Sequence, residues 1–133
     1  MDLGLTDRVV LVTGGSRGLG KTICRMLAEE GARVAVNYRS RREEAEAVAR
    51  GIQEEFGRRV AAIYGDVSRE ADVIAMFDEA ARQLGPVDAL VNNAAVCPVG
   101  ATAELSVDDF SQALQVNMTG TFLASRELVR RLL

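Results

Sequence analysis

Short apolar runs alternate along this chain with longer segments in which apolar residues recur every three or four positions. The short runs are typical of buried parallel strands, and the longer period is typical of amphipathic helices. The pattern predicts strands over residues 8–12, 33–37, 59–64 and 88–91. It predicts helices over residues 18–30, 41–56, 69–84 and 107–133, with a break in the last one near 117–120. Such alternation favours an α/β fold with helices on both faces of a parallel sheet.

Serine residues mark the expected starts of three of these helices. Ser40, with Glu43 three positions later, predicts a capping box, in which each side chain bonds a free backbone N–H group of the other. Ser68 is the expected N-cap of the next helix. Ser106 precedes Asp109 by three positions and predicts the start of the last helix.

The first apolar run ends in a glycine-rich turn, and the helical pattern begins directly after it. Residues 13–20 read Thr-Gly-Gly-Ser-Arg-Gly-Leu-Gly, so that Gly14, Gly18 and Gly20 are spaced as Gly-x-x-x-Gly-x-Gly. Glycine lets the chain turn sharply and lets backbone N–H groups approach a ligand. Together with the positive end of the helix dipole, these N–H groups predict a pyrophosphate site. The alternative is a turn that uses glycine for its geometry alone.

Composition and charge narrow the classes of function. With 133 residues the chain has the size of one domain, which we assign to residues 1–133. Its net charge of −3 argues against nucleic-acid binding, and no apolar segment is long enough to span a membrane. The absence of histidine removes a common metal ligand and general base, so we expect no metal site. Two cysteines, Cys24 and Cys97, are too few for a disulfide scaffold and favour a reduced, cytoplasmic protein.

The glycine spacing, preceded by Thr13, resembles the cofactor motif of the short-chain dehydrogenase/reductase family. Within that family the chain is most similar to the 3-oxoacyl-(acyl carrier protein) reductases. The resemblance implies a doubly wound Rossmann-type sheet with strand order 3-2-1-4, and a nicotinamide dinucleotide bound at the glycine turn. It implies cofactor contacts from six residues of that turn, namely Gly14, Ser16, Arg17, Gly18, Leu19 and Gly20.

The end of the second predicted strand bears on which dinucleotide binds. NAD enzymes of this type place a carboxylate there, which accepts hydrogen bonds from the ribose hydroxyls, whereas this chain has Asn37. Tyr38, Arg39 and Ser40 follow, and Arg17 can approach from the glycine turn. Because an arginine fork binds a phosphate that a carboxylate would repel, these residues favour NADP, as NADPH, over NAD. The alternative is that the arginine cluster here forms a solvated helix start.

Two further strand ends carry motifs that resemble those of the family. Asp66 and Val67 follow the third strand and match the pair that contacts the adenine ring. Residues 92–95 read Asn-Asn-Ala-Ala and resemble the Asn-Asn-Ala-Gly motif after the fourth strand. The resemblance implies a structural role for Asn92 at the centre of the sheet. It places three residues nearer the cofactor, namely Asn93, Ala94 and Ala95.

Asn117 matches the helix asparagine of the family's catalytic tetrad, whose implied role is to bend the helix and hold a water in a proton relay. The other members are a serine and a Tyr-x-x-x-Lys pair. This chain has no such pair, since its tyrosines are Tyr38 and Tyr64 and its one lysine is Lys21. Without that pair no acid is recognisable that would protonate a carbonyl oxygen as hydride arrives.

We therefore expect the amino-terminal part of an NADPH-dependent carbonyl reductase, truncated before the catalytic Tyr/Lys segment and inactive by itself. A 3-oxoacyl thioester is one candidate substrate. The alternatives are a dinucleotide-binding module without chemistry, and one chain of an enzyme that a second chain completes in trans.

The expected partners follow from the same hypothesis. A sheet that stops at its fourth strand leaves that strand as an edge with unpaired backbone groups. Apolar side chains of the last helix would lack partners as well, and in the family this helix lines a dimer interface. We expect a small-molecule carbonyl or alcohol substrate and a homo-oligomer formed through the last helix, with no nucleic-acid or membrane partner.

Overall fold

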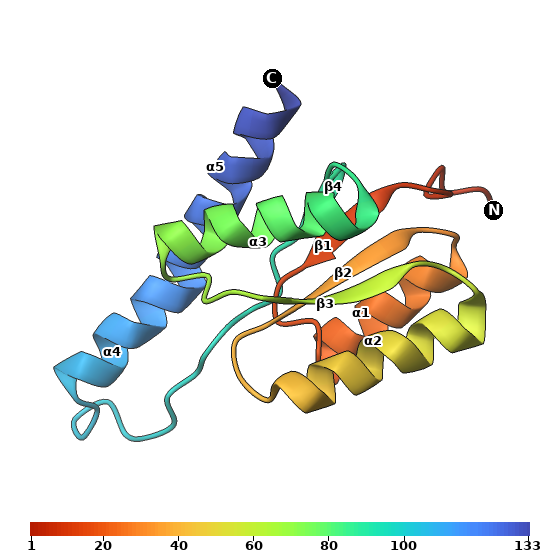
Figure 1. Ribbon diagram of the computed structural model, residues 1–133. Helices are drawn as coiled ribbons and strands as arrows, with labels where there is room; N and C mark the ends of the chain where they lie inside the picture. The colour runs from red at the N-terminus through yellow and green to blue at the C-terminus, as the bar shows by residue number, and fades with distance from the viewer.

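The computed structural model describes all 133 residues and contains a four-stranded parallel sheet in the order β3-β2-β1-β4 (Figure 1). This order confirms the predicted Rossmann-type topology. The strands are β1 (Val9–Val12), β2 (Arg33–Tyr38), β3 (Val60–Tyr64) and β4 (Ala89–Val91). The helices are α1 (Gly18–Glu29), α2 (Arg42–Phe56), α3 (Glu70–Leu84), α4 (Val107–Leu114), the π-helical segment η1 (Gln115–Thr119) and α5 (Gly120–Leu132).

Helices cover both faces of the sheet, because successive side chains of a strand point to opposite sides. Val9 and Leu11 of β1 belong to the core cluster that includes residues of α3 and α5. Val10 and Val12 belong to the cluster that includes residues of α1 and α2. Figure 1 shows these two helix pairs on opposite sides of the sheet. All of β1 is buried, as expected for a continuous apolar run at the centre of a parallel sheet.

Both cysteines are free thiols in contrasting surroundings. Cys24 of α1 is fully buried in the second cluster, and this burial raises the pKa of its thiol to about 12. Its sulfur lies against the glycine turn, since a Cβ atom added to Gly15 would be 2.9 Å from it. Cys97 is exposed in the loop after β4. Cys24 therefore acts as a small packing residue beneath the turn.

The predicted capping box at the start of α2 is wrong. The helix begins at Arg42, and the residue before it, Arg41, has a left-handed backbone with a φ of 58°. No side chain caps this helix start. Because Arg41 redirects the chain between Ser40 and the helix, the Ser40 hydroxyl does not reach the amide of Glu43, its predicted partner.

The predicted cap at Ser68 is also wrong, whereas the cap at Ser106 is confirmed. The Ser68 hydroxyl donates to Oδ1 of Asp66 at 2.6 Å, so it bonds backwards along the chain instead of capping α3. The amide of Asp66 donates to the carboxylate of Asp72 in the first turn of α3, which draws the loop onto the helix start. Ser106 accepts from the amide of Asp109 at 3.0 Å, as its sequence spacing predicts.

The last helical segment departs from α-helical geometry where the sequence predicts a break. Segment η1 separates α4 from α5, and the three continue one another as a single long rod (Figure 1). Gly120 starts α5 at a close contact, because a Cβ atom there would lie 2.7 Å from Cγ2 of Val67. The break thus coincides with the point where the rod packs against the loop after β3.

Segment α4 and strand β4 are sparsely covered. Helix α4 has no buried residue, and six apolar side chains along the rod are more than half exposed, among them Phe110 at 55%, Phe122 at 58% and Leu132 at 59%. Strand β4 pairs only with β1 and forms one edge of the sheet. This confirms the expected edge and the unpartnered apolar face. The homo-oligomer through the last helix stays a prediction.

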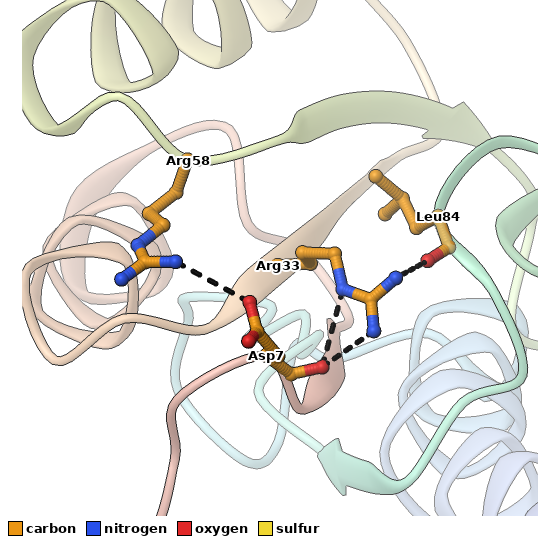
Figure 2. A network of polar contacts seen from close by, with 4 residues as sticks. All are labelled: Asp7, Arg33, Arg58 and Leu84. Atoms are coloured by element: carbon orange, nitrogen blue, oxygen red, sulfur yellow. Dashed lines mark hydrogen bonds and ion pairs between the residues drawn. The ribbon is translucent and has the colours of Figure 1, made fainter.

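At the amino ends of the strands, one arginine joins three segments of the chain (Figure 2). Arg33, the first residue of β2, donates from Nε and Nη2 to the backbone carbonyl of Asp7 and from Nη1 to that of Leu84. Asp7 itself has a left-handed backbone with a φ of 62°. Its carboxylate accepts from Arg58 at 3.3 Å. Arg33 therefore fixes the lead-in to β1 against the end of α3.

Replacing Arg33 with alanine is expected to lower the free energy of unfolding by about 2 kcal/mol, because hydrogen bonds from a charged donor to two carbonyls are lost. Arg58→Ala removes a single ion pair between partly exposed side chains and should cost less than about 1 kcal/mol. Urea denaturation of both variants measures the difference. Equal losses would show that Arg33 contributes no more than a surface ion pair.

Candidate functional site

A pocket of about 460 Å³ lies at the carboxyl ends of all four strands. This is the edge at which open parallel α/β sheets bind their ligands. The pocket gathers twelve of the fifteen residues predicted for the site: Gly14, Ser16, Arg17, Gly18, Tyr38, Arg39, Ser40, Asp66, Val67, Asn93, Ala94 and Ala95. Four others also line it, Asn37, Gly65, Val96 and Val116. Leu19, Gly20 and Asn117 lie outside the lining.

Backbone amides of the glycine turn fall into two groups. Those of Gly14 and Gly15 are bonded inward, to the side-chain oxygen of Asn37 at 3.1 Å and to its backbone carbonyl at 2.9 Å. The five amides from Ser16 to Gly20 donate to no acceptor in the chain, and no side chain caps the start of α1. Free amides at a helix start, next to the positive end of the dipole, form an anion-binding site.

The three motif glycines meet different requirements. Gly14 and Gly18 have φ values of 61° and 53°, which favour glycine. Gly20 is needed for space, because a Cβ atom there would overlap the Gly14 carbonyl and lie 2.5 Å from Nδ2 of Asn93. Gly20 thus allows α1 to pack closely against the Gly14 carbonyl and the Asn93 side chain. The Leu19 side chain is 70% exposed on α1. Leu19 and Gly20 do not line the pocket, so any contact they make with a ligand comes from their amides.

Thr13 and Asn93 connect the glycine turn to the loop after β4. The Thr13 hydroxyl oxygen accepts from the amides of Asn93 and Ala94, both at 3.0 Å. The Asn93 side chain donates to the carbonyls of Thr13 and Gly14. Asn92 is exposed and donates to Ser125 of α5. The bonds that join β4 to the glycine turn thus come from Asn93, whereas the structural role predicted for Asn92 stays a prediction.

The cluster of arginines after β2 divides into paired and unpaired members. Arg41 pairs with Glu44 at 3.5 Å, and Arg42 pairs with Glu46 at 2.8 Å. The hydrogen bond from Glu46 raises the pKa of Arg42 above its usual value. Arg39 makes no ion pair and lines the pocket, as does Arg17 on the facing glycine turn. The solvated-helix interpretation thus fits Arg41 and Arg42 only, and two guanidinium groups remain free at the pocket.

Asn37 does not occupy the ribose position predicted for it. It is 2% exposed, and its amide group is used within the protein: Oδ1 accepts from Gly14, and Nδ2 donates to the carbonyls of Gly65 and Ile63 at 3.0 and 3.3 Å. Strand β2 continues to Tyr38, which is also buried, so Arg39 is the first exposed side chain after the strand. Residue 37 is therefore not the strand-end position that faces the ribose, because its side chain points inward.

Asp66 and Val67 form the wall of the pocket after β3, two strands away in the sheet from β1 and its glycine turn. Oδ1 of Asp66 accepts from the amide and hydroxyl of Ser68, whereas Oδ2 accepts no bond within the chain. Val67 is buried against Gly120 at the start of α5. This wall offers one acceptor oxygen beside an apolar surface, which suits the amino edge and the face of a heteroaromatic ring.

The site has no metal-binding constellation, since no group of three or more His, Cys, Asp or Glu residues could hold an ion. No helix of the structure has both the length and the hydropathy to cross a bilayer.

Comparison with known proteins agrees with this geometry. The profile of the short chain dehydrogenase family matches residues 8–133, nearly the whole chain. The chain belongs to this family. NADPH-dependent aldehyde reductase 2, a chloroplastic protein of Arabidopsis thaliana, is 41% identical over 142 residues, with 98% of this chain and 52% of that protein covered. 3beta-hydroxysteroid dehydrogenase 1 of Eggerthella lenta is 38% identical over 125 residues, with 94% of this chain and 48% of that protein covered.

Solved structures of the short chain dehydrogenase family share the architecture. A short-chain dehydrogenase/reductase from Serratia marcescens superposes with a TM-score of 0.88 at 41% identity, covering 96% of this chain and 51% of that one. A short chain dehydrogenase from Burkholderia cenocepacia in complex with NADP gives 0.88 at 40% identity, covering 95% and 51%. The chain spans about half the length of these relatives.

Asn117, the candidate for the family's tetrad asparagine, lies in the π-helical segment η1. Its side chain pairs with the backbone of Val96, accepting from the amide and donating to the carbonyl at 2.8 Å each. Its own carbonyl accepts from the Thr121 hydroxyl. Because Val96 lines the pocket, Asn117 acts on the pocket by holding the loop after β4. Its role in holding a relay water stays a prediction.

Proposed function

We propose that this chain is the dinucleotide-binding part of an NADPH-dependent carbonyl reductase. The observation that carries the proposal is the run of five unbonded amides, Ser16 to Gly20, at the uncapped start of α1 beside the pocket. Five consecutive free donors in a folded chain call for an acceptor, and a pyrophosphate has the charge and the number of oxygens to satisfy them. The dinucleotides carried by relatives of known structure support this assignment.

The remaining lining residues divide along the length of such a ligand. Asp66 and Val67 would receive the adenine ring, with the free Oδ2 of Asp66 accepting from its amino group. Arg17 and Arg39 would hold the 2′-phosphate between them. Asn93, Ala94 and Ala95, which line the pocket after β4, would face the ribose and ring of the nicotinamide, which supplies hydride to a carbonyl carbon. The chain's own residues thus bind, orient and neutralise charge.

NADPH is preferred to NADH in this proposal because two unpaired guanidinium groups line the pocket, that of Arg39 after β2 and that of Arg17 in the glycine turn. Arg39 has no carboxylate partner, and Asp66, the one acidic residue of the lining, is hydrogen-bonded to Ser68. A phosphate monoester satisfies both guanidinium groups, whereas a free ribose hydroxyl leaves them without an anion. The name of the aldehyde reductase from Arabidopsis thaliana also specifies NADPH.

The substrate of the whole protein is proposed as a small carbonyl compound, with a 3-oxoacyl thioester as one candidate from the sequence resemblance. The 133 residues contain no Tyr-x-x-x-Lys pair that would donate the proton. That observation favours, as a second candidate function for the chain by itself, a binding module without chemistry or one chain of an enzyme completed in trans.

Fluorescence titration of the chain with the reduced dinucleotides tests the proposal. We expect saturable binding of NADPH, with an affinity about tenfold or more above that for NADH, which corresponds to about 1.4 kcal/mol from the phosphate contacts. Addition of an aldehyde to the complex should leave the NADPH absorbance unchanged, because the proton donor is absent. Equal affinities would overturn the NADP assignment, and no binding of either would overturn the dinucleotide site. Rapid oxidation of NADPH would overturn the inactive state of the chain.

A further inference from the structure

Asn37 is a buried polar residue at the meeting point of three strand ends. Its backbone carbonyl and side-chain oxygen accept from two amides of the turn after β1, those of Gly15 and Gly14 respectively. Its side-chain nitrogen donates to the carbonyls of Ile63 and Gly65 at the end of β3. Gly14 and Gly65 are both lining residues, one on the phosphate side of the pocket and one on the adenine side. Asn37 thus connects its two walls.

We infer that Asn37 is a positioning residue, which fixes the separation of the phosphate-binding turn from the adenine-binding wall before any dinucleotide arrives. This inference rests on the proposed function for the identity of the ligand. The spacing itself is set inside the protein, through hydrogen bonds that need no ligand. Since the amides of Gly14 and Gly15 are held inward, the next five amides are the ones left without an acceptor in the chain.

The chemistry of this junction requires a side chain that accepts on one side and donates on the other. Asparagine does both at this length. An aspartate at position 37 would still accept from Gly14 but would place a buried carboxylate against the carbonyl oxygens of Ile63 and Gly65, with no proton to offer them. Burying an unpaired charge against acceptors is strongly unfavourable. An acid at position 37 therefore cannot act as a ribose acceptor, and the choice between coenzymes is made at the residues after it.

The effect of Asn37→Asp on the two coenzymes distinguishes a positioning role from a ribose contact. If residue 37 faced the ribose, Asn37→Asp would weaken NADPH binding and strengthen NADH binding, since a carboxylate repels the 2′-phosphate and accepts from the free hydroxyls. If it positions the walls, the same substitution weakens both coenzymes by one common factor, of about 10- to 100-fold, and leaves their ratio unchanged. Asn92→Asp is the matched control, because Asn92 is exposed and outside the pocket lining.

Two measurements test the inference. Titration of wild type, Asn37→Asp and Asn92→Asp with NADPH and NADH should show parallel losses in Asn37→Asp only, and a shift of the ratio toward NADH would overturn the positioning role. Amide hydrogen exchange by NMR, on the wild-type chain without ligand, should show slow exchange at Gly14 and Gly15 and fast exchange from Ser16 to Leu19. Fast exchange at Gly14 would overturn the inference whether or not the Asn37→Asp protein folds. If wild type binds neither coenzyme, the proposed function fails while exchange still decides the role of Asn37.

Discussion

Replacing Gly20 with alanine is expected to reduce NADPH affinity by about 100-fold and to lower the free energy of unfolding by about 2–3 kcal/mol. The new methyl group would overlap the Gly14 carbonyl oxygen and lie 2.5 Å from Nδ2 of Asn93. Both atoms belong to the hydrogen-bonded junction between the turn and the loop after β4, so neither can retreat alone. The free amides of the turn move with that junction. NADPH titration and urea denaturation measure the two effects.

Gly51→Ala is the matched control for this substitution. Gly51 lies in the interior of α2 and is exposed, and a methyl group added there would meet no atom within 4 Å other than its own helix and chain neighbours. Its replacement should leave NADPH affinity unchanged and stabilise the protein by about 0.5–1 kcal/mol, since alanine has the higher helix propensity. A Gly20→Ala protein that bound NADPH as tightly as wild type would contradict the tight packing of the turn.

Arg39→Ala should weaken NADPH binding by about 10- to 100-fold and change NADH binding by less than about twofold. The side chain is exposed, unpaired and at the pocket, so its removal should leave the protein fold intact and remove only the contact with the 2′-phosphate. The ratio of the two dissociation constants, measured by fluorescence titration at low and high salt, isolates this contribution. Salt should reduce the wild-type preference, because the contact is partly electrostatic and solvent-accessible.

Arg130→Ala controls for the loss of one positive charge. Arg130 is exposed on α5 and does not line the pocket. It should leave both affinities unchanged apart from a small effect at low salt. Parallel losses of NADPH and NADH affinity in Arg39→Ala would assign Arg39 to the pyrophosphate or to the shape of the pocket, and would remove the basis for NADP preference.

The strands could be predicted because buried parallel strands have continuous apolar sequences. Val9 to Val12 are all buried, and the predicted bounds of β1, β3 and β4 agree with the structure to within one residue. The helix starts were less predictable. The cap at Ser106 was predicted correctly, because it depends only on residues three positions apart. The capping box at Ser40 does not form, because the backbone of Arg41 is left-handed. The Ser68 hydroxyl bonds to Asp66 instead of capping α3, and the spacing of Ser68 from the helix does not predict that bond.

The site was predictable where its chemistry follows the strand ends directly. Gly14 to Gly18, Arg39 and Asp66 all come within a few residues of a strand, and all but Gly15 of these line the pocket. Val116 reaches the pocket from the far end of the chain, through the packing of η1, and no local pattern encodes that approach. The sequence did indicate that Asn37 points inward, because strand alternation places it on the same side as the buried Ala35. A buried amide at a strand end needs hydrogen-bond partners within the protein.

The sixteen residues that line the pocket all fall between Gly14 and Val116. The residues proposed to distinguish NADPH from NADH, Arg17 and Arg39, lie within this stretch. A recombination breakpoint placed after Val116 would therefore transfer the whole of this lining into a chimera as one unit.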